Sequence, residues 1–99
     1  MIGKKEKILR GDRMPNDRYV RGRLKEYRIR KELLNAGFDI AQRSAGSHSP
    51  IDVFAIDKKN RCIRFVQCKP DDMPVSKINK ILKEFEWLDG EFNVEFDVE

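Results

Sequence analysis

The chain has 99 residues, enough for one domain with a single modest core, and 38% of them are charged. The mean hydropathy of −0.68, the lack of any apolar run of about 18 residues and a first stretch without signal-peptide character argue against membrane or secreted classes. Cys62 and Cys68 lie six residues apart in one predicted strand, too far to form a disulfide. We therefore expect a protein without membrane contact in the cytoplasm, or in the host cytoplasm if the chain is viral.

The net charge of +4 is unevenly distributed along the chain. Residues 1–31 carry twelve Lys and Arg against four Asp and Glu, a net charge of +8, whereas residues 84–99 carry seven acids and no base. A basic end of this density attracts a polyanion, which makes DNA or RNA the first candidate partner. The alternative is a solvated tail that only keeps the protein in solution.

The first predicted elements are a flexible basic arm over residues 1–17 and a helix over residues 18–36, at the start of one folded domain over residues 18–99. Gly37 is typical of the position just after a helix. The helix carries two stripes of mainly apolar residues, Gly22, Glu26, Ile29, Leu33 and Ala36 on one side and Val20, Leu24, Tyr27 and Leu34 on the other. A surface helix needs one apolar face, so the second stripe suggests a partner subunit or another cover.

The remaining chain predicts three strands, a second helix and a last strand. The three strands are expected over residues 38–42, 51–56 and 61–69, the last two forming a hairpin around the turn at residues 57–60. An amphipathic helix should then run to about Asp89 and stop at Gly90. Residues 91–98 alternate apolar and polar, which is typical of a half-buried strand. The expected fold is α/β, a mixed sheet flanked by helices in the order α-β-β-β-α-β.

Three residues around the predicted hairpin suggest metal-dependent phosphodiester chemistry, which needs acidic oxygen ligands, an activated water and a cation near the phosphate. Asp52 opens the second predicted strand, and Gln67 and Lys69 share one face of the third. A turn centred at residues 58–59 places Asp52 opposite Phe65, two residues short of Gln67. A bulge or a longer loop could absorb that shift.

Glu26 is the fourth candidate, because an inward carboxylate in an apolar stripe needs a partner, and a metal is one. Each candidate also has a plain structural alternative. Glu26 could form a salt bridge near Arg23 or Arg30, and Asp52 could be a turn residue. Gln67 and Lys69 could face outward on an edge strand. Taken singly, each residue favours the structural alternative.

The combination of segments is more specific than any single residue. The segments are residues 21–26 (RGRLKE), 37–38 (GF), 43–47 (RSAGS), 50–52 (PID) and 67–69 (QCK). In this order and at these separations they resemble archaeal-type Holliday-junction resolvases and their relatives among archaeal and viral nucleases, over about residues 19–98. Gln-x-Lys alone is unspecific, whereas the ordered set is a specific signal.

The resemblance implies a PD-(D/E)XK nuclease with a restriction-endonuclease-like fold. It also implies a homodimer that resolves four-way DNA junctions in recombination and repair by paired nicking, with Mg²⁺ as cofactor and Mn²⁺ as its substitute. By position, the family's catalytic residues are Glu26, Asp52, Gln67 and Lys69, of which the first three match the metal ligands. Arg43 and Ser47 match the loop that faces DNA, and further DNA-binding candidates are Arg21, Arg23 and His48.

Two positions depart from the family's pattern. Gln67 stands where the resolvases usually have Glu, and its amide oxygen can coordinate a hard cation but contributes no charge, so metal affinity should be weaker. Tyr27 follows Glu26 where an Arg is common, and Arg28 or Arg23 is the candidate substitute. Two alternatives stay open: a restriction-like or repair nuclease of the same fold that acts on other DNA, and a non-catalytic DNA-binding protein on a nuclease scaffold.

Overall fold

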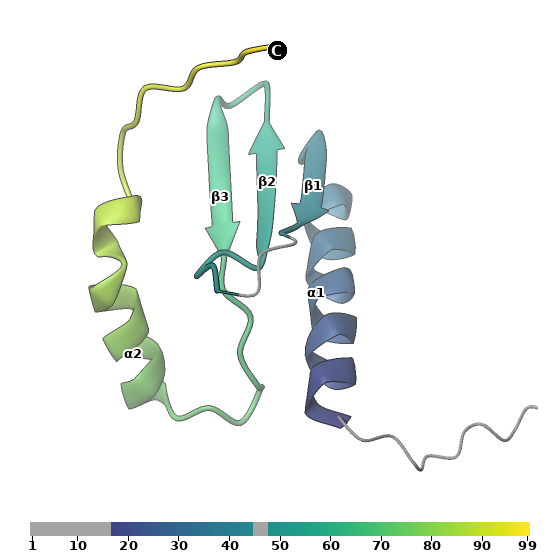
Figure 1. The fold of residues 1–99 in the computed structure, drawn as a ribbon, viewed down its shortest axis with the longest axis vertical. Helices are drawn as coiled ribbons and strands as arrows, with labels where there is room; N and C mark the ends of the chain where they lie inside the picture. The colour runs from purple at the N-terminus through teal and green to yellow at the C-terminus, as the bar shows by residue number, and fades with distance from the viewer. Residues whose placement is uncertain (1–16, 45–47) are drawn as a thin grey trace, which may run out of the picture. The chain divides into compact units, whose positions relative to one another are not determined.

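The computed structural model describes residues 17–44 and 48–99, which are mixed α/β. They belong to two compact units, a first unit that ends at Lys69 and a second unit from Pro70 to Glu99. The elements are α1 (Asp17–Asn35), β1 (Ile40–Arg43), β2 (Val53–Asp57), β3 (Cys62–Val66), α2 (Val75–Glu84) and the 3-10 helix η2 (Glu86–Leu88) (Figure 1). Of the expected arm over residues 1–17, only Asp17 falls within the described residues, where it begins α1.

The end of α1 follows from Gly37, as the sequence predicts. Gly37 has a φ of +111°, a left-handed conformation that a glycine adopts without steric cost. Its N–H donates to the Leu34 carbonyl (3.1 Å), and the Phe38 N–H donates to the Leu33 carbonyl (3.2 Å). This pair of hydrogen bonds is a Schellman motif, which satisfies the last carbonyls of the helix and turns the chain toward β1.

The three strands form one antiparallel sheet in the order β1-β2-β3. Val53 pairs with Val66 and Asp57 with Cys62, so the expected pairing of Asp52 with Phe65 is wrong by two residues. The reason is the hairpin loop, which has four residues, 58–61, instead of two. The Asp57 carboxylate accepts the N–H groups of two loop residues, Lys59 and Asn60, which stabilises the longer turn.

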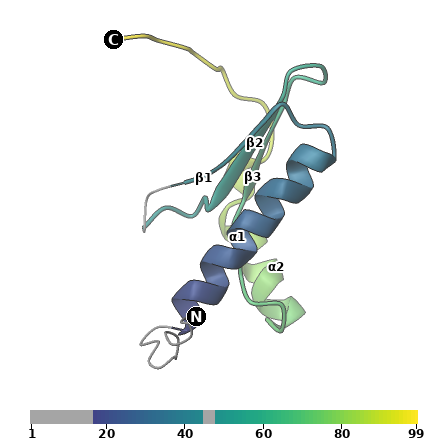
Figure 2. The same ribbon diagram turned by 90° about the vertical axis from the view of Figure 1, so that its right-hand side faces the viewer.

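A small core lies between α1 and the sheet. Its buried members are Leu33, Ala41, Val53 and Ala55. The alanines leave room for the helix to lie close over β1 and β2 (Figure 2). Arg30 adds a polar link, because its Nε donates to the Ala41 carbonyl at 2.8 Å. The predicted inward stripe of α1 is thus confirmed at Leu33, and at Ile29, which packs against the core.

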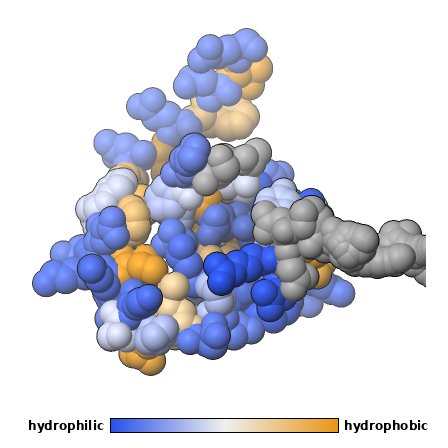
Figure 3. All heavy atoms as spheres, turned by 60° about the horizontal axis from the view of Figure 1, so that its bottom comes forward, coloured by the Kyte–Doolittle hydropathy of each residue, from blue (hydrophilic) through white to orange (hydrophobic). Residues whose placement is uncertain are grey.

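Several large apolar side chains remain at the surface of the first unit. Leu24 and Tyr27, from the second stripe of α1, are exposed. On the face of the sheet away from α1, Ile40, Ile63 and Phe65 are also exposed. Apolar side chains reach the surface between hydrophilic ones in Figure 3. The first unit therefore buries one face of its sheet.

The strands are shorter than the sequence predicts. β1 begins at Ile40 instead of residue 38, since residues 37–39 complete the turn out of α1. β3 ends at Val66 instead of Lys69, because the Cys68 N–H donates to the Asp52 side chain and not to a strand carbonyl (2.8 Å). Gln67 and Lys69 therefore do not share one face of a strand.

The second unit differs from the prediction more strongly. The expected single helix to about Asp89 is divided into α2 and η2, and Gly90 follows with a φ of +140°. The expected strand over residues 91–98 is wrong for this structure, in which residues 91–99 have no regular secondary structure and are exposed. Alternation makes a segment suitable for a sheet edge, but a strand forms only where another strand supplies its hydrogen bonds. The described structure pairs no strand with these residues.

Candidate functional site

Asp52 lies where the three strands end together. Its N–H donates to the Val66 carbonyl (2.8 Å), and its carbonyl accepts the Ser44 N–H (2.9 Å). Its side chain accepts the Cys68 N–H (2.8 Å). Both the backbone and the carboxylate of Asp52, the residue before β2, are thereby held by residues at the end of β3 and after β1 and β3. A carboxylate held in this way is preorganised to bind a cation.

Gln67 belongs to the segment after β3 that bonds to Asp52. The Val53–Val66 pair is the last of the β2–β3 register, and Asp52 then donates to the Val66 carbonyl and accepts the Cys68 N–H, so the Gln67 backbone lies between two residues that bond to Asp52. Gln67 is half-buried, and its Oε1 atom is fully buried with no hydrogen-bond partner among the described residues. An amide oxygen buried without a donor costs about 1–3 kcal/mol, which a water or a bound cation at this atom would offset. The longer hairpin loop thus shifts the β2–β3 register by two residues in the direction of Gln67.

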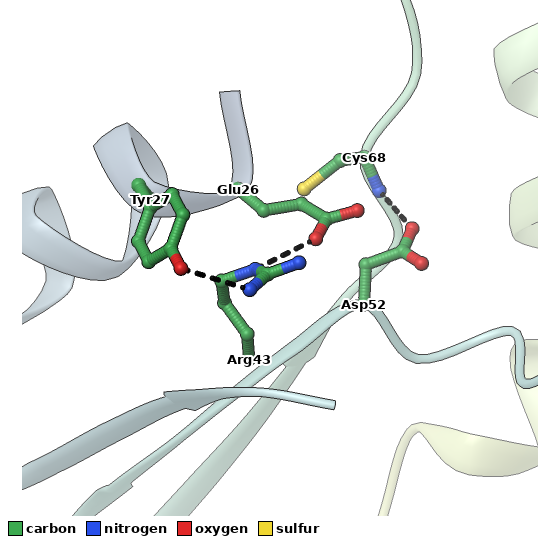
Figure 4. A network of polar contacts seen from close by, with 5 residues as sticks. All are labelled: Glu26, Tyr27, Arg43, Asp52 and Cys68. Atoms are coloured by element: carbon green, nitrogen blue, oxygen red, sulfur yellow. Dashed lines mark hydrogen bonds and ion pairs between the residues drawn. The ribbon is translucent and has the colours of Figure 1, made fainter. Parts of the chain in front are cut away.

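Glu26 projects from α1 toward the same place and contacts Arg43, the last residue of β1 (Figure 4). The Arg43 Nε donates to Glu26 Oε1 at 3.0 Å, and the side chains are only 28% and 20% exposed. The sequence suggested Arg23 or Arg30 as a salt-bridge partner of Glu26. Helix-based reasoning missed Arg43 because the contact joins two elements, seventeen residues apart.

Tyr27 is the functional candidate that the sequence marked only as a departure from a pattern. Arg43 Nη1 donates to the Tyr27 hydroxyl at 3.2 Å, and the guanidinium lies 4.5 Å from the centre of the ring. The hydrogen bond to Glu26 is the main reason that the pKa of Arg43 is raised. The arginine that Tyr27 contacts at this site is therefore Arg43 from β1, whereas Arg28 pairs with Glu32 at 3.6 Å.

The causes of the pKa shift of Cys68 indicate which charged groups surround the site. Burial is the main cause that raises the pKa of its thiol to about 11, and the negative charges of Asp52 and Glu26 raise it further. Figure 4 shows the Cys68 sulfur beside the Glu26 side chain and the Asp52 carboxylate at the Cys68 N–H. Lys25 and Arg28 lower the same pKa. The site therefore combines two carboxylates with nearby cations.

Lys69 is half-buried and belongs to the segment after β3. Its carbonyl accepts a hydrogen bond from the Lys25 ammonium, so α1 is tied to the segment that contains Gln67. Lys25 was not singled out from the sequence, because its position one residue before Glu26 gives no sign of a contact with residue 69.

The donor set can be tested for Mg²⁺ on these contacts. Among residues 17–44 and 48–99, no three His, Cys, Asp or Glu side chains form a group suited to a metal ion. Mg²⁺, however, keeps several waters and needs only one or two carboxylates from the protein. Asp52 supplies one carboxylate, and the segment bonded to it carries the unpartnered Gln67 oxygen, a donor set whose chemistry suits such an ion, whereas Glu26 is engaged with Arg43.

The DNA-binding candidates are partly placed. Arg21, Arg23 and His48 are exposed, and the Arg23 guanidinium lies 5.2 Å from the centre of the Tyr19 ring. Ser47 lies outside the described residues. Arg21 and Arg23 are therefore exposed on the helix that also carries Glu26.

Comparisons with family models, with curated proteins and with solved structures find no match for this chain. Within the part of the chain that the structure describes, neither helix has the length and apolar character needed to cross a membrane.

Proposed function

We propose that the protein is a metal-dependent DNA endonuclease whose active site is formed by Glu26, Asp52, Gln67 and Lys69. The observation that carries this proposal is the anchored carboxylate of Asp52, held by the segment that also bears the buried, unpartnered oxygen of Gln67. Two oxygen ligands at one end of a sheet suit a hard divalent cation. The basic helix α1 beside them suits a polyanionic substrate.

Asp52, Gln67 and, once freed from Arg43, Glu26 would hold Mg²⁺, with Mn²⁺ as a substitute. When bound, the ion supplies an activated water and neutralises charge that develops on the phosphate. Lys69 provides a positive charge that orients the water or stabilises the developing negative charge. Arg43 positions the DNA backbone, and Arg21, Arg23, Ser47 and His48 make further contacts with DNA.

The finer proposal concerns substrate and fold. The order α1-β1-β2-β3-α2 is compatible with a restriction-endonuclease-like fold, and the resemblance of residues 19–98 to archaeal-type resolvases favours four-way junctions cut by paired nicking. A homodimer would present two equivalent sites to two equivalent strands. The exposed apolar side chains of Leu24 and Tyr27 on α1 supply surface for such an association.

A cleavage assay on a synthetic four-way junction and a linear duplex, with Mg²⁺ or with a chelator, tests the proposal. We expect Mg²⁺-dependent cleavage of the junction, its loss in Asp52→Asn and retained DNA binding, since an asparagine oxygen still accepts the Cys68 N–H. Asp39→Asn is the matched control, because this exposed carboxylate accepts a backbone N–H at the opposite end of the sheet.

Each alternative has its own outcome in this assay. Equal cleavage of duplex and junction favours a restriction-like or repair nuclease, and DNA binding without any cleavage favours a non-catalytic binder. Full activity of Asp52→Asn contradicts the assignment of the site. Sedimentation at micromolar concentration tests the dimer, since the mass of one 11.7 kDa chain with and without DNA rules out paired nicking by a homodimer.

A further inference from the structure

Arg43 is held in place by two neighbouring residues of α1 that differ in charge. Glu26 accepts a hydrogen bond from Nε at 3.0 Å, and Tyr27 accepts one from Nη1 at 3.2 Å while the centre of its ring lies 4.5 Å from the guanidinium (Figure 4). The ion pair neutralises Glu26. The ring and hydroxyl of Tyr27 hold the guanidinium from another side and need no carboxylate to do so.

A DNA phosphate is a direct competitor for Glu26 in this arrangement. Guanidinium groups bind carboxylates and phosphates through the same planar fork of N–H donors. The Arg43 side chain is 28% exposed, so an anion can reach it, and the exposed Tyr27 ring would keep the guanidinium in place during the exchange. A phosphate that takes the place of Glu26 leaves that carboxylate without its cation.

We propose that Arg43 exchanges Glu26 for a DNA phosphate and so couples DNA binding to metal binding. In the DNA-free protein, Arg43 keeps Glu26 from the metal position. When a phosphate binds Arg43, Glu26 is released to join Asp52 and Gln67 as a ligand, and Tyr27 acts as the positioning residue that holds the guanidinium. This inference rests on the proposed function and adds the order in which its ligand set is completed.

The exchange predicts a non-additive effect on metal binding, measurable without DNA cleavage. Mn²⁺ binding to the full-length, DNA-free protein is followed by electron paramagnetic resonance for the wild type, Glu26→Gln, Arg43→Gln and the double variant. Two residues that act on the metal independently of each other have additive effects on its binding. If Arg43 blocks Glu26, Glu26→Gln should weaken Mn²⁺ binding about fivefold more in the Arg43→Gln background than in the wild type. Equal losses in both backgrounds overturn the exchange.

The phosphate half of the exchange is tested by DNA binding in a chelator, where no metal is bound. Glu26→Gln frees Arg43 and should increase the affinity for a fluorescent four-way junction about fivefold more in the wild type than in the Arg43→Gln background. An equal increase in both backgrounds shows that Arg43 does not bind phosphate, which also overturns the exchange.

Two further variants separate the possible causes of failure. Arg30 also links α1 to β1 but donates to a backbone carbonyl. In an Arg30→Gln background, Glu26→Gln should therefore weaken Mn²⁺ binding by the same factor as in the wild type. A larger effect in that background would show that loosening of the helix, and not the ion pair, is responsible. Mn²⁺ binding should be lost in Asp52→Asn. Undiminished Mn²⁺ binding by Asp52→Asn contradicts the metal site itself. If Mn²⁺ binding does depend on Asp52 but the losses in the Glu26 and Arg43 variants add, only the exchange is overturned.

Discussion

The two units of the chain have comparable apolar patterns and very different burial. The first unit packs the inward stripe of α1 against β1 and β2 and buries four residues in a core. The second unit has a clear amphipathic helix and a strictly alternating segment, yet none of residues 70–99, all of which the structure describes, is buried. A periodic pattern therefore predicts which face of an element is apolar, but burial depends on a second surface that must be present to cover it.

The largest expected difference between the units is in backbone hydrogen exchange. The amides of β2 are hydrogen-bonded in the middle of the sheet, whereas those of residues 91–98 have no strand partner in the structure. For a domain with about 5 kcal/mol of stability, β2 amides should exchange at least about a thousandfold more slowly than those of residues 91–98. Comparable protection of residues 91–98 would break the comparison and restore the predicted strand.

Core truncation should show the same contrast in the free energy of unfolding. Leu33→Ala removes a buried side chain and should cost about 2–5 kcal/mol. Leu82→Ala in α2 makes the same chemical change at a side chain that is 64% exposed, and should cost less than about 0.5 kcal/mol. Urea denaturation of both variants measures the difference, and a similar loss for Leu82→Ala would show that the second unit is packed.

Within the first unit, the two free cysteines differ in burial. Burial and the nearby carboxylates raise the pKa of the Cys68 thiol to about 11, whereas Cys62 is exposed. A raised pKa leaves less thiolate near neutral pH, which is only partly offset by the greater nucleophilicity of that thiolate. Alkylation at about pH 7.5, followed by mass spectrometry, should be about tenfold slower at Cys68 than at Cys62. Equal rates would contradict the raised pKa of the Cys68 thiol.

The smallest expected effect concerns the charge at Gln67. Gln67→Glu adds a carboxylate to the proposed metal site, and one unit charge at about 4 Å from the ion contributes about 1 kcal/mol even in water. The Mg²⁺ concentration for half-maximal cleavage should therefore fall about fivefold. A titration that is unchanged or shifted upward would show that the side chain at this position does not contact the metal.

Much of the first unit could be predicted from local signals in the sequence. Gly37 marked the end of α1, and the inward position of Leu33 followed from helical spacing. The hairpin was also expected, but its register was wrong because a turn centred at residues 58–59 is two residues shorter than the loop that forms. The end of β3 was missed because it depends on a side-chain contact from Asp52.

The candidate site shows the same division between local and long-range information. Glu26, Asp52, Gln67 and Lys69 were chosen from residue type and order. The Arg43 contact with Glu26 and Tyr27 was not, because it depends on how closely α1 lies over the sheet. The strand expected at residues 91–98 failed for a related reason, since alternation carries no information about the partner strand that must be present.

The central claim is that Asp52 and Gln67 form a metal site, and anomalous diffraction from crystals that contain Mn²⁺ tests it most directly. The account predicts an anomalous peak within coordination distance of the Asp52 carboxylate and Gln67 Oε1, lost in crystals of Asp52→Asn. A map without a peak at Asp52, in which Gln67 Oε1 accepts a hydrogen bond from a protein donor, would contradict the claim.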